Sequence, residues 1–473
     1  MSMKSSNTPR VPAFNDGTDT IAAIATAPGE GAVAIVRLSG PESLQIADVA
    51  FSPMRGPCAS ERTSHTVCFG RVTSSDGRPI DESLMLIMRG PHSFTGEDVV
   101  EFQGHGGRIA ASRILKRMLE CGARSAEPGE FTRRAFMNGK MDMLQAESVL
   151  DLVRAQSDMS AARAIEQMEG GLSREINSAY DHLLHAGSEL EATLDFSEDE
   201  IPETAVPECV ERIDCASNQI RRLLASWEEG RVLREGIRVT ILGRPNAGKS
   251  SLFNMLLEQD RAIVSPHPGT TRDTLEECVI WGGWPVRLTD TAGLRDSECS
   301  IEQEGVRRSR KQQAESDLAL YVADAHLPPH PDDLAYLSSA PPARTLLILN
   351  KSDLGRHAAW ESSGFINESI FSIATDPAYK QRIVISCVGR FEREFVSALP
   401  HPAAISERHR HELDIALRAA ESARDRLCAD TPSGAVLACE SIREATSALG
   451  RITGREYSSE LLNAIFGRFC IGK

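Results

Sequence analysis

The sequence predicts a multidomain protein of the α/β and α-helical classes, in which a doubly wound, mostly parallel sheet interrupts a helical domain. Its 473 residues are enough for about three domains of ordinary size. Between residues 235 and 400, short β-branched or aliphatic runs alternate with helical segments, which is the pattern of a doubly wound sheet. Long amphipathic segments precede and follow this stretch, so one domain is expected to lie inside another.

An α+β domain is expected over residues 1–137. Two apolar runs separated by a Gly/Pro turn predict a hairpin within residues 20–38. Further strands are expected at Ser83–Met88 and Val99–Phe102. Apolar residues at helical spacing predict a helix over Arg108–Cys121.

Helices are expected to fill residues 138–234 and 401–473, the two parts of one helical domain. Leu, Ile, Val and Ala recur there at three- and four-residue spacing, as on the buried face of an amphipathic helix. The pair Gly170-Gly171 is the only expected break in the first part. The segments with this spacing are Leu144–Phe196, His411–Cys428 and Ser441–Leu449.

Composition excludes several classes of protein. Hydrophobic residues make up 41% and charged residues 25% of the chain, as in ordinary globular proteins. There is no apolar run of the roughly 18 to 20 residues that a membrane span needs, and no signal-peptide core near the start, so a cytoplasmic protein is expected. The eleven cysteines show no C-x-x-C pair, which argues against a structural zinc site. The net charge of -15 means that binding to a polyanion is expected to need a local patch or a basic partner.

A phosphate-binding loop is predicted at Gly243–Ser250. The segment reads GRPNAGKS, matches G-x-x-x-x-G-K-[ST] and directly follows a predicted strand at Ile237–Leu242. In such a loop backbone N–H groups surround phosphate, Lys249 meets the β and γ charges and the Ser250 hydroxyl ligates Mg²⁺. The residues of this loop expected at the nucleotide are Asn246, Ala247, Gly248, Lys249, Ser250 and Ser251.

The base is expected to be guanine. In Asn350-Lys351-Ser352-Asp353, the Asp353 carboxylate can accept hydrogen bonds from guanine N1–H and the 2-amino group, a donor pair that adenine lacks. A polar loop that caps a helix is the alternative for so short a motif. A further guanine contact is expected at Ser386, after a predicted strand at Ile383–Ile385.

Two other segments complete the prediction of a GTPase. Asp290-Thr291-Ala292-Gly293 offers a carboxylate on the metal side and a glycine N–H that can sense a γ-phosphate. Leu294 follows where many Ras-type GTPases have a water-orienting glutamine, so another group must orient the water. The loop Ser265–Asp273 is rich in hydroxyls, and its Thr271 can complete the Mg²⁺ shell; a surface turn is the alternative.

These features resemble the tRNA-modifying GTPase family called MnmE or TrmE over essentially the whole chain. The shared features are the G-x-P-N-A-G-K-S and G-T-T-R-D loops, the inserted G domain and the terminal Phe469-Cys-Ile-Gly-Lys473. The resemblance implies that K⁺ takes the place of an arginine finger, beside the β–γ bridging oxygen. The residues implied to hold K⁺ are Asn246, Ser265, His267 and Thr270. Glu302 is implied to orient or activate the water, with a solvated helix residue as the alternative.

The first domain is similar to the family's folate-binding domain, which is related to that of aminomethyltransferases. The matching segments are Ala34–Gly40, Phe94–Glu101, Gln103–Gly106 and Phe131–Lys140. The resemblance implies that Arg37, Glu101, Lys140 and Lys473 contact 5-formyltetrahydrofolate or a related one-carbon folate. Basic side chains suit the glutamate carboxylates of such a ligand, and Glu101 suits donors of the pterin. An ordinary surface charge is the alternative for each of them.

The implied function is K⁺-stimulated GTP hydrolysis coupled to addition of a carboxymethylaminomethyl group at C5 of the wobble uridine U34. An FAD-containing partner, a homodimer, a heterotetramer of the two proteins and tRNA bound through the complex are all implied by the resemblance. Arg468 and Lys473 would stabilise a thiolate at Cys470, and the resemblance implies that this residue takes part in the modification; a free surface thiol is the alternative. The rival functions are a ribosome-assembly GTPase and a regulatory GTPase that acts only on proteins.

Overall fold

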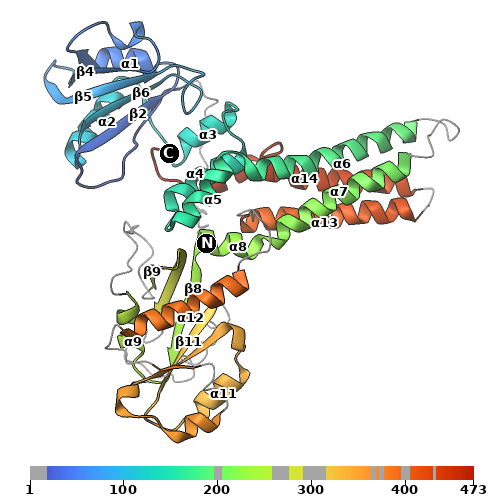
Figure 1. Ribbon diagram of the computed structural model, residues 1–473. Helices are drawn as coiled ribbons and strands as arrows, with labels where there is room; N and C mark the ends of the chain where they lie inside the picture. The colour runs from blue at the N-terminus through green and yellow to red at the C-terminus, as the bar shows by residue number, and fades with distance from the viewer. Residues whose placement is uncertain are drawn as a thin grey trace, which may run out of the picture. The chain divides into compact units, whose positions relative to one another are not determined.

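The computed structural model describes residues 19–195, 205–257, 276–290, 316–363, 369–371, 378–395, 405–429 and 433–473. The chain forms two compact units (Figure 1). Unit 1 comprises Met1–Leu150 and Thr453–Lys473, and unit 2 comprises Asp151–Ile452. The last residues of the chain therefore belong to the same unit as the first.

Unit 1 contains a seven-stranded sheet in the order β3-β4-β5-β6-β2-β1-β7. All neighbours are antiparallel except the pair β1–β7. The predicted hairpin is confirmed, because β1 and β2 pair with Ile24 opposite Val36. The strands are β1 (Ile21–Ile24), β2 (Val33–Ser39), β3 (Phe51–Pro53), β4 (Thr66–Thr73), β5 (Pro79–Met88), β6 (Val99–His105) and β7 (Arg124–Ser125).

The two faces of this sheet are covered differently. Helices α1 (Ser43–Ala50) and α2 (Arg108–Glu120) pack on one face and bury the larger core of the unit. The predicted helix over Arg108–Cys121 is thus confirmed. On the opposite face, Phe131 of α3 (Glu130–Met137) packs in a small cluster with Ile21, Ala23 and Ala126.

The C-terminal segment packs onto the helices that follow this sheet. Met143 and Ala146 of α4 (Met143–Arg154) share a core with Leu462, Ile465, Phe466 and Phe469, which come from α15 (Ser459–Phe466) and the residues after it. Ile471 then forms an antiparallel bridge with Pro128. Because of these contacts, the terminal residues reach the sheet of unit 1.

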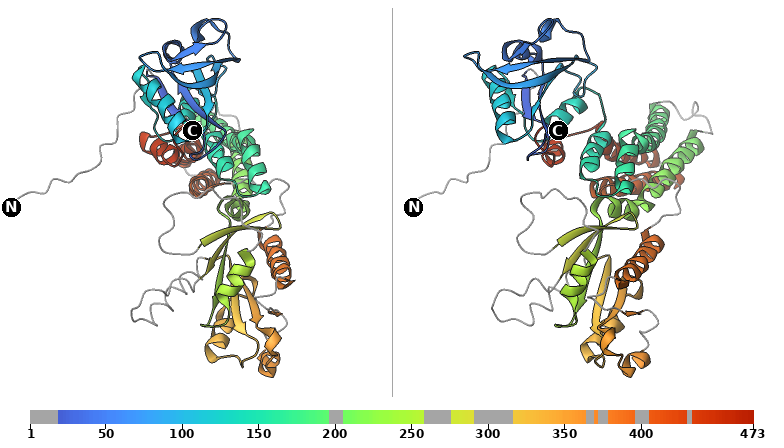
Figure 2. Two further views of the ribbon diagram at one scale, coloured as in Figure 1. Left: turned by 90° about the vertical axis from the view of Figure 1, so that its left-hand side faces the viewer. Right: turned by 60° about the vertical axis from the view of Figure 1, so that its left-hand side comes forward.

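Unit 2 contains long helices that run side by side in Figure 1 and in both views of Figure 2. They pack through small and aliphatic side chains at helical spacing, such as Ala179, Leu183 and Ala186 on α6 (Gly171–Asp195). The predicted helical stretch has a second break, which the sequence analysis missed: Ser157 caps the start of α5 (Asp158–Met168) by accepting a hydrogen bond from the Ser160 N–H. The helices are α5 (Asp158–Met168), α6 (Gly171–Asp195), α7 (Ala205–Ala225), α8 (Trp227–Glu235), α13 (Glu407–Cys428) and α14 (Gly434–Thr453).

The second part of unit 2 is a six-stranded sheet in the order β13-β12-β11-β8-β10-β9, parallel except for the pair β10–β9. The α/β and α-helical multidomain class predicted from the sequence is confirmed. The strands are β8 (Ile237–Gly243), β9 (Glu276–Trp281), β10 (Trp284–Asp290), β11 (Leu318–Asp324), β12 (Thr345–Asn350) and β13 (Ser369–Phe371). Within the described residues, the helices of this part are α9 (Lys249–Leu257), α11 (Pro331–Ser339) and α12 (Ala378–Phe395). The described 3-10 helices of both units are η1 (Ala59–Glu61), η4 (Pro342–Arg344), η5 (Ser352–Leu354) and η6 (Ala358–Ser363).

The predicted strand over Ile383–Ile385 is wrong. This run lies inside α12, where Ile383, Cys387 and Phe391 recur every four residues and are 0%, 0% and 1% exposed. That period belongs to a helix buried along one side, and it outweighs the strand preference of a short β-branched run. Ser386 therefore lies on a helix, and the guanine-contact loop predicted there does not exist at this position.

Candidate functional sites

The predicted phosphate-binding loop lies between β8 and α9. Two of its glycines are required by space as well as by conformation. Gly243 has φ +136°, and a Cβ there would collide with the backbone oxygen of Val322; Gly248 has φ +95°, and its Cβ would collide with the side chain of Asn350. Neighbouring strand ends thus approach this loop so closely that only glycine fits.

The first residues of α9 are the Lys and Ser of the phosphate motif. Lys249 begins the helix, and its Nζ donates a hydrogen bond of 2.8 Å to the Arg244 oxygen within the loop. Ser250 follows in the first turn and is exposed. The N-terminus of a helix carries unpaired N–H groups and partial positive charge, so this geometry favours an anion such as phosphate.

Asn350 connects the phosphate loop to the predicted guanine motif. It is the last residue of β12 and 2% exposed, and its Nδ2 donates to the Ala247 oxygen at 2.9 Å. Lys351 follows with φ +57° and forms an ion pair of 2.8 Å with Asp324. Asp353 lies in η5 and is exposed, as a residue that meets a base must be.

These contacts gather residues from the carboxyl ends of β8, β11 and β12, the edge at which open α/β sheets bind ligands. The sequence reasoning missed Asp324, which ends β11 and pairs with Lys351. The feature of the sequence that could have indicated Asp324 is its place as a polar residue directly after the buried apolar run from Leu318 to Ala323.

Several predicted nucleotide residues lie outside the described part of the chain. They are Ser265, His267, Thr270, Thr271, Thr291, Ala292, Gly293 and Glu302. Of the others, Asp290 is the last residue of β10 and pairs with Ile241 of β8, so its backbone lies next to the strand that leads into the phosphate loop. Ser251 lies on α9 and is exposed.

A second candidate site lies on the sheet of unit 1. Arg37 on β2 and Glu101 on β6 are direct cross-strand partners, and Arg37 Nε donates to Glu101 Oε1 at 2.7 Å. The guanidinium lies 5.6 Å from the ring centroid of Phe94 and equally far from that of Phe131, within range of cation–π attraction. The sequence reasoning placed both rings in matching segments and gave neither a role.

Lys140 and Lys473 belong to segments that adjoin these rings. Lys140 Nζ donates to the Pro91 oxygen at 2.9 Å, in the turn that carries Phe94. The Phe131 N–H donates to the Lys473 oxygen at 3.2 Å. Contacts thus run from Lys140 through the two rings and Arg37 to Lys473, so the structure brings the four residues predicted for folate into one region.

The terminal C-x-G-K segment is held by its backbone. Gly472 has φ +94°, and a Cβ there would collide with the backbone oxygen of Ile24. The Cys470 oxygen accepts hydrogen bonds from the N–H of Gly129 at 3.4 Å and of Lys473 at 3.3 Å. Cys470 itself is exposed, so its thiol is accessible to solvent.

Two features, a membrane-spanning helix and a metal-binding group of side chains, are absent from the part of the chain that the structure describes. None of its helices combines the length and apolarity that a membrane crossing requires. Over the same residues, no group of three or more His, Cys, Asp or Glu side chains is arranged to hold a metal ion.

Comparison with known proteins finds two family models that together match most of the chain. The family model of the MnmE helical domain matches residues 143–470, and that of the GTP-binding protein TrmE N-terminus matches residues 20–140. Among solved structures, the G domain of the T. maritima FeoB iron transporter is similar over 33% of this chain and 98% of that chain, at 21% identity and a TM-score of 0.25, which is too low to bear on function.

Relatives are similar over almost the whole length. The tRNA modification GTPase MnmE of Symbiobacterium thermophilum is 42% identical over 469 residues, which is 97% of this chain and 100% of that protein. The protein of the same name from Moorella thermoacetica is 41% identical over 470 residues, or 96% and 99% of the two chains. That from Akkermansia muciniphila is 41% identical over 468 residues, or 97% and 100%. With a helical-domain match over more than half of its length and full-length relatives of one name, this chain belongs to the MnmE family of tRNA modification GTPases.

Proposed function

We propose that this protein hydrolyses GTP in a K⁺-stimulated reaction that serves the addition of a carboxymethylaminomethyl group at C5 of the tRNA wobble uridine U34. It acts in the cytoplasm together with an FAD-containing partner. The observation that carries the GTPase part is the 2.9 Å hydrogen bond from Asn350 to Ala247, which joins the guanine motif to the phosphate loop. One nucleotide can therefore meet both.

The roles at the nucleotide follow from the chemistry of each group. Mg²⁺ would neutralise charge on the β- and γ-phosphates, and the exposed Ser250 hydroxyl, with Thr271, suits it as a ligand. K⁺ would add positive charge beside the bridging oxygen, and the exposed amide of Asn246 suits it together with Ser265, His267 and Thr270. Glu302 orients the attacking water, and the thiol of Cys470 acts in the modification rather than in hydrolysis.

The Arg37–Glu101 pair supports the proposed folate site. A guanidinium paired with a carboxylate and lying near two aromatic rings fits a ligand with carboxylates, ring N–H donors and a flat pterin. A one-carbon folate such as 5-formyltetrahydrofolate supplies carbon for the modification when bound. Lys140 and Lys473 complete the site by meeting its carboxylates.

An exposed apolar face of unit 1 supports the proposed homodimer. Phe69 on β4 lies opposite Leu84 on β5, and Val67 lies opposite Leu86. Val67, Phe69 and Leu84 are 58%, 48% and 42% exposed, which is unusual for three large apolar side chains on one sheet face. A second copy of this face would cover them. Replacement of Phe69 by Glu is expected to yield monomers in sedimentation velocity.

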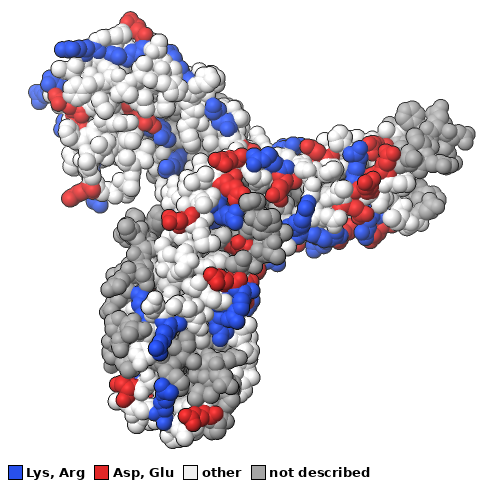
Figure 3. All heavy atoms as spheres, viewed as in Figure 1, with Lys and Arg blue, Asp and Glu red and all other residues white. Residues whose placement is uncertain are grey.

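The distribution of charge supports the proposal that tRNA is held mainly through the complex. In the view of Figure 3, basic and acidic side chains of the described residues are interspersed, without a broad basic field. The net charge of -15 points the same way. Binding of tRNA therefore falls largely to the partner, in a heterotetramer of two copies of each protein.

The domain boundaries that we propose are those that the sequence predicts. Residues 1–137 form the folate-binding-like and dimerisation domain, residues 235–400 form the G domain, and residues 138–234 and 401–473 form the helical domain. The range matched by the helical-domain model, 143–470, includes the G domain, which supports the insertion.

Mass analysis of tRNA wobble uridines tests this function. In cells that lack the protein, the carboxymethylaminomethyl group is expected to disappear from U34 and to return when the gene is restored. The alternative is a ribosome-assembly GTPase that acts as an RNA-linked switch. That reading predicts unchanged wobble uridines and incomplete ribosomal particles, so the same cells decide between the two.

A further inference from the structure

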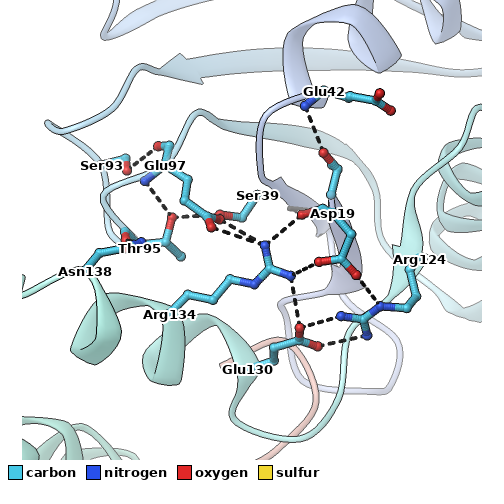
Figure 4. Close-up of polar contacts among 11 residues, drawn as sticks. Asp19, Ser39, Glu42, Ser93, Thr95, Glu97, Arg124, Glu130, Arg134 and Asn138 are labelled. Carbon is cyan, nitrogen blue, oxygen red and sulfur yellow. Dashed lines mark hydrogen bonds and ion pairs between the residues drawn. The ribbon is translucent and has the colours of Figure 1, made fainter. Parts of the chain in front are cut away.

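A partly buried ionic cluster in unit 1 involves α3 and the turn before β6 (Figure 4). It combines three carboxylates with two guanidinium groups. Four of the five side chains are at most 20% exposed. The members are Asp19, Glu97, Arg124, Glu130 and Arg134.

The guanidinium of Arg134 joins three separate segments of the chain. Its Nη1 donates to the backbone oxygen of Asp19 at 2.9 Å and to Glu97 Oε1 at 3.2 Å. Its Nη2 donates to Asp19 Oδ1 at 2.7 Å and to Glu130 Oε1 at 3.1 Å. Arg134 thereby ties α3 to Asp19, two residues before β1, and to the turn before β6. A planar fork of donors suits this task, whereas the ammonium group of a lysine does not.

Glu97 fixes the turn that carries Phe94. Its carboxylate accepts a hydrogen bond of 2.6 Å from Ser39 Oγ, and Ser39 Oγ lies 2.7 Å from Thr95 Oγ1. Asn138 Nδ2 donates to the Thr95 oxygen at 2.7 Å from the other side. Phe94 precedes Thr95 directly, so these contacts fix the residue that follows the ring.

Glu130 fixes the start of α3 in the same way. Its carboxylate accepts hydrogen bonds from Arg124 Nη2 at 2.6 Å and from the Glu127 N–H at 2.8 Å. Phe131 is the next residue of that helix. Phe131 is 0% exposed and packs with three other buried residues, whereas Phe94 is only partly buried against this cluster. Phe94 therefore depends more than Phe131 on the polar contacts that hold its segment.

We propose that Glu97 and Glu130 are positioning residues of the site around Arg37. Through Arg134 they hold Phe94 and Phe131 against the guanidinium of Arg37, and so set the direction in which Arg37 and Glu101 meet a ligand. Buried ion pairs add little net stability compared with apolar side chains of similar size, and fixed geometry is what such a cluster can contribute. That the ligand is a folate rests on the proposed function.

A double-mutant cycle tests the inference through ligand affinity. Calorimetry of the full chain with 5-formyltetrahydrofolate compares Glu97→Gln, Phe94→Leu and the double variant with the unaltered protein. Glu97→Gln alone is expected to weaken binding by about tenfold, and to have little further effect once Phe94 is Leu, because contacting groups couple. A purely structural role would reduce affinity by the same factor in both backgrounds, and that result would overturn the inference.

Glu82→Gln, which breaks the exposed ion pair with Arg71 on the same sheet, is the matched control. It is expected to bind 5-formyltetrahydrofolate as tightly as the unaltered protein.

A second readout does not depend on folate. In crystal structures without ligand, Glu97→Gln is expected to move the Phe94 ring away from Arg37 while the sheet stays unchanged, and Glu130→Gln is expected to do the same to Phe131. Rings that stay in place in both variants overturn the inference, even if affinity falls. If the unaltered protein binds no folate but the rings move, the proposed ligand is wrong and the positioning role stands.

Discussion

Asn350 Nδ2 lies 2.9 Å from the backbone oxygen of Ala247 and donates a hydrogen bond to it. The two residues are 103 positions apart in sequence, and both are buried, with exposed fractions of 2% and 4%. This bond connects the end of β12 to the phosphate loop after β8. Loss of this bond is expected to loosen the phosphate loop.

Replacement of Asn350 by Ala should therefore weaken guanine nucleotide binding and lower the free energy of unfolding by about 1–3 kcal/mol, the cost of a buried polar group that loses its partner. Titration of a fluorescent GDP analogue and denaturant unfolding measure the two effects. Asn218→Ala, at an exposed position of α7, is the control and should change neither. Equal nucleotide affinity in the Asn350 variant would contradict a role in joining the two loops.

Acid should destabilise unit 1 through the ionic cluster around Arg134. Burial disfavours the charged forms of Asp19 and Glu130. Hydrogen bonds from Arg124 and Arg134 outweigh it at Asp19, and hydrogen bonds from Arg124 and the Glu127 N–H, with attraction to both arginines, outweigh it at Glu130, so the pKa of each carboxyl lies below its ordinary value. The unfolded chain then binds more protons than the folded chain as pH falls through this range, and stability drops with pH. The ordinary pKa values are 3.8 and 4.5, so the loss should begin below about pH 4.5 and continue to the lower pKa values of the folded state.

Thermal unfolding between about pH 3 and pH 6 measures this effect. Replacement of Glu130 by Gln removes one of the two carboxyls with a lowered pKa. The midpoint temperature of thermal unfolding should therefore vary less with pH in the variant than in the unaltered protein. Glu82→Gln serves as the control, because its carboxylate is exposed. The assignment fails if the Glu130 variant keeps the full slope.

Periodic patterns made most of the fold predictable. β11 and β12 are nearly continuous apolar runs because both faces of a parallel sheet are covered, and the strand predicted at Ile237–Leu242 is confirmed as β8. The run Ile383–Ile385 misled because three β-branched or aliphatic residues fit either a strand or the buried side of a helix. Only the four-residue spacing that continues to Phe391 distinguishes them.

The residues of the candidate sites could be predicted where one short segment contains all the interacting groups. The phosphate loop and the guanine motif are such segments. Asp324, Phe94 and Phe131 were missed because their roles come from partners far away in sequence: Lys351 lies 27 residues from Asp324, and the Arg37–Glu101 pair that the rings flank spans 64 residues. Pairing of strands creates such neighbours, and no local spacing reveals them.

Potassium should accelerate GTP hydrolysis relative to sodium. Asn246 has φ +62° and is exposed at the phosphate loop, so its amide oxygen is available as a ligand. Asn246→Gly removes the amide and tolerates this left-handed backbone, so it should lower the rate in KCl by about tenfold or more without unfolding the loop. Rates in KCl and NaCl should then be equal in the variant, whereas Asn218→Ala should keep the difference. Identical rates in the two salts for the unaltered protein would refute the potassium assignment.

Cys470→Ser should separate hydrolysis from tRNA modification. The backbone at Cys470 is held by Gly129 and Lys473, and serine is close in size to cysteine, so the terminal segment should keep its place. Serine has no thiolate at neutral pH, so any step that needs this nucleophile should stop. GTP hydrolysis should stay within about twofold of the unaltered rate, because the nucleotide residues are on other segments.

Mass analysis of wobble uridines in complemented cells should show no modified U34 with the Cys470 variant and normal levels with Cys428→Ser, which alters an exposed cysteine on α13. Normal U34 modification by the Cys470 variant would reduce this residue to a free surface thiol.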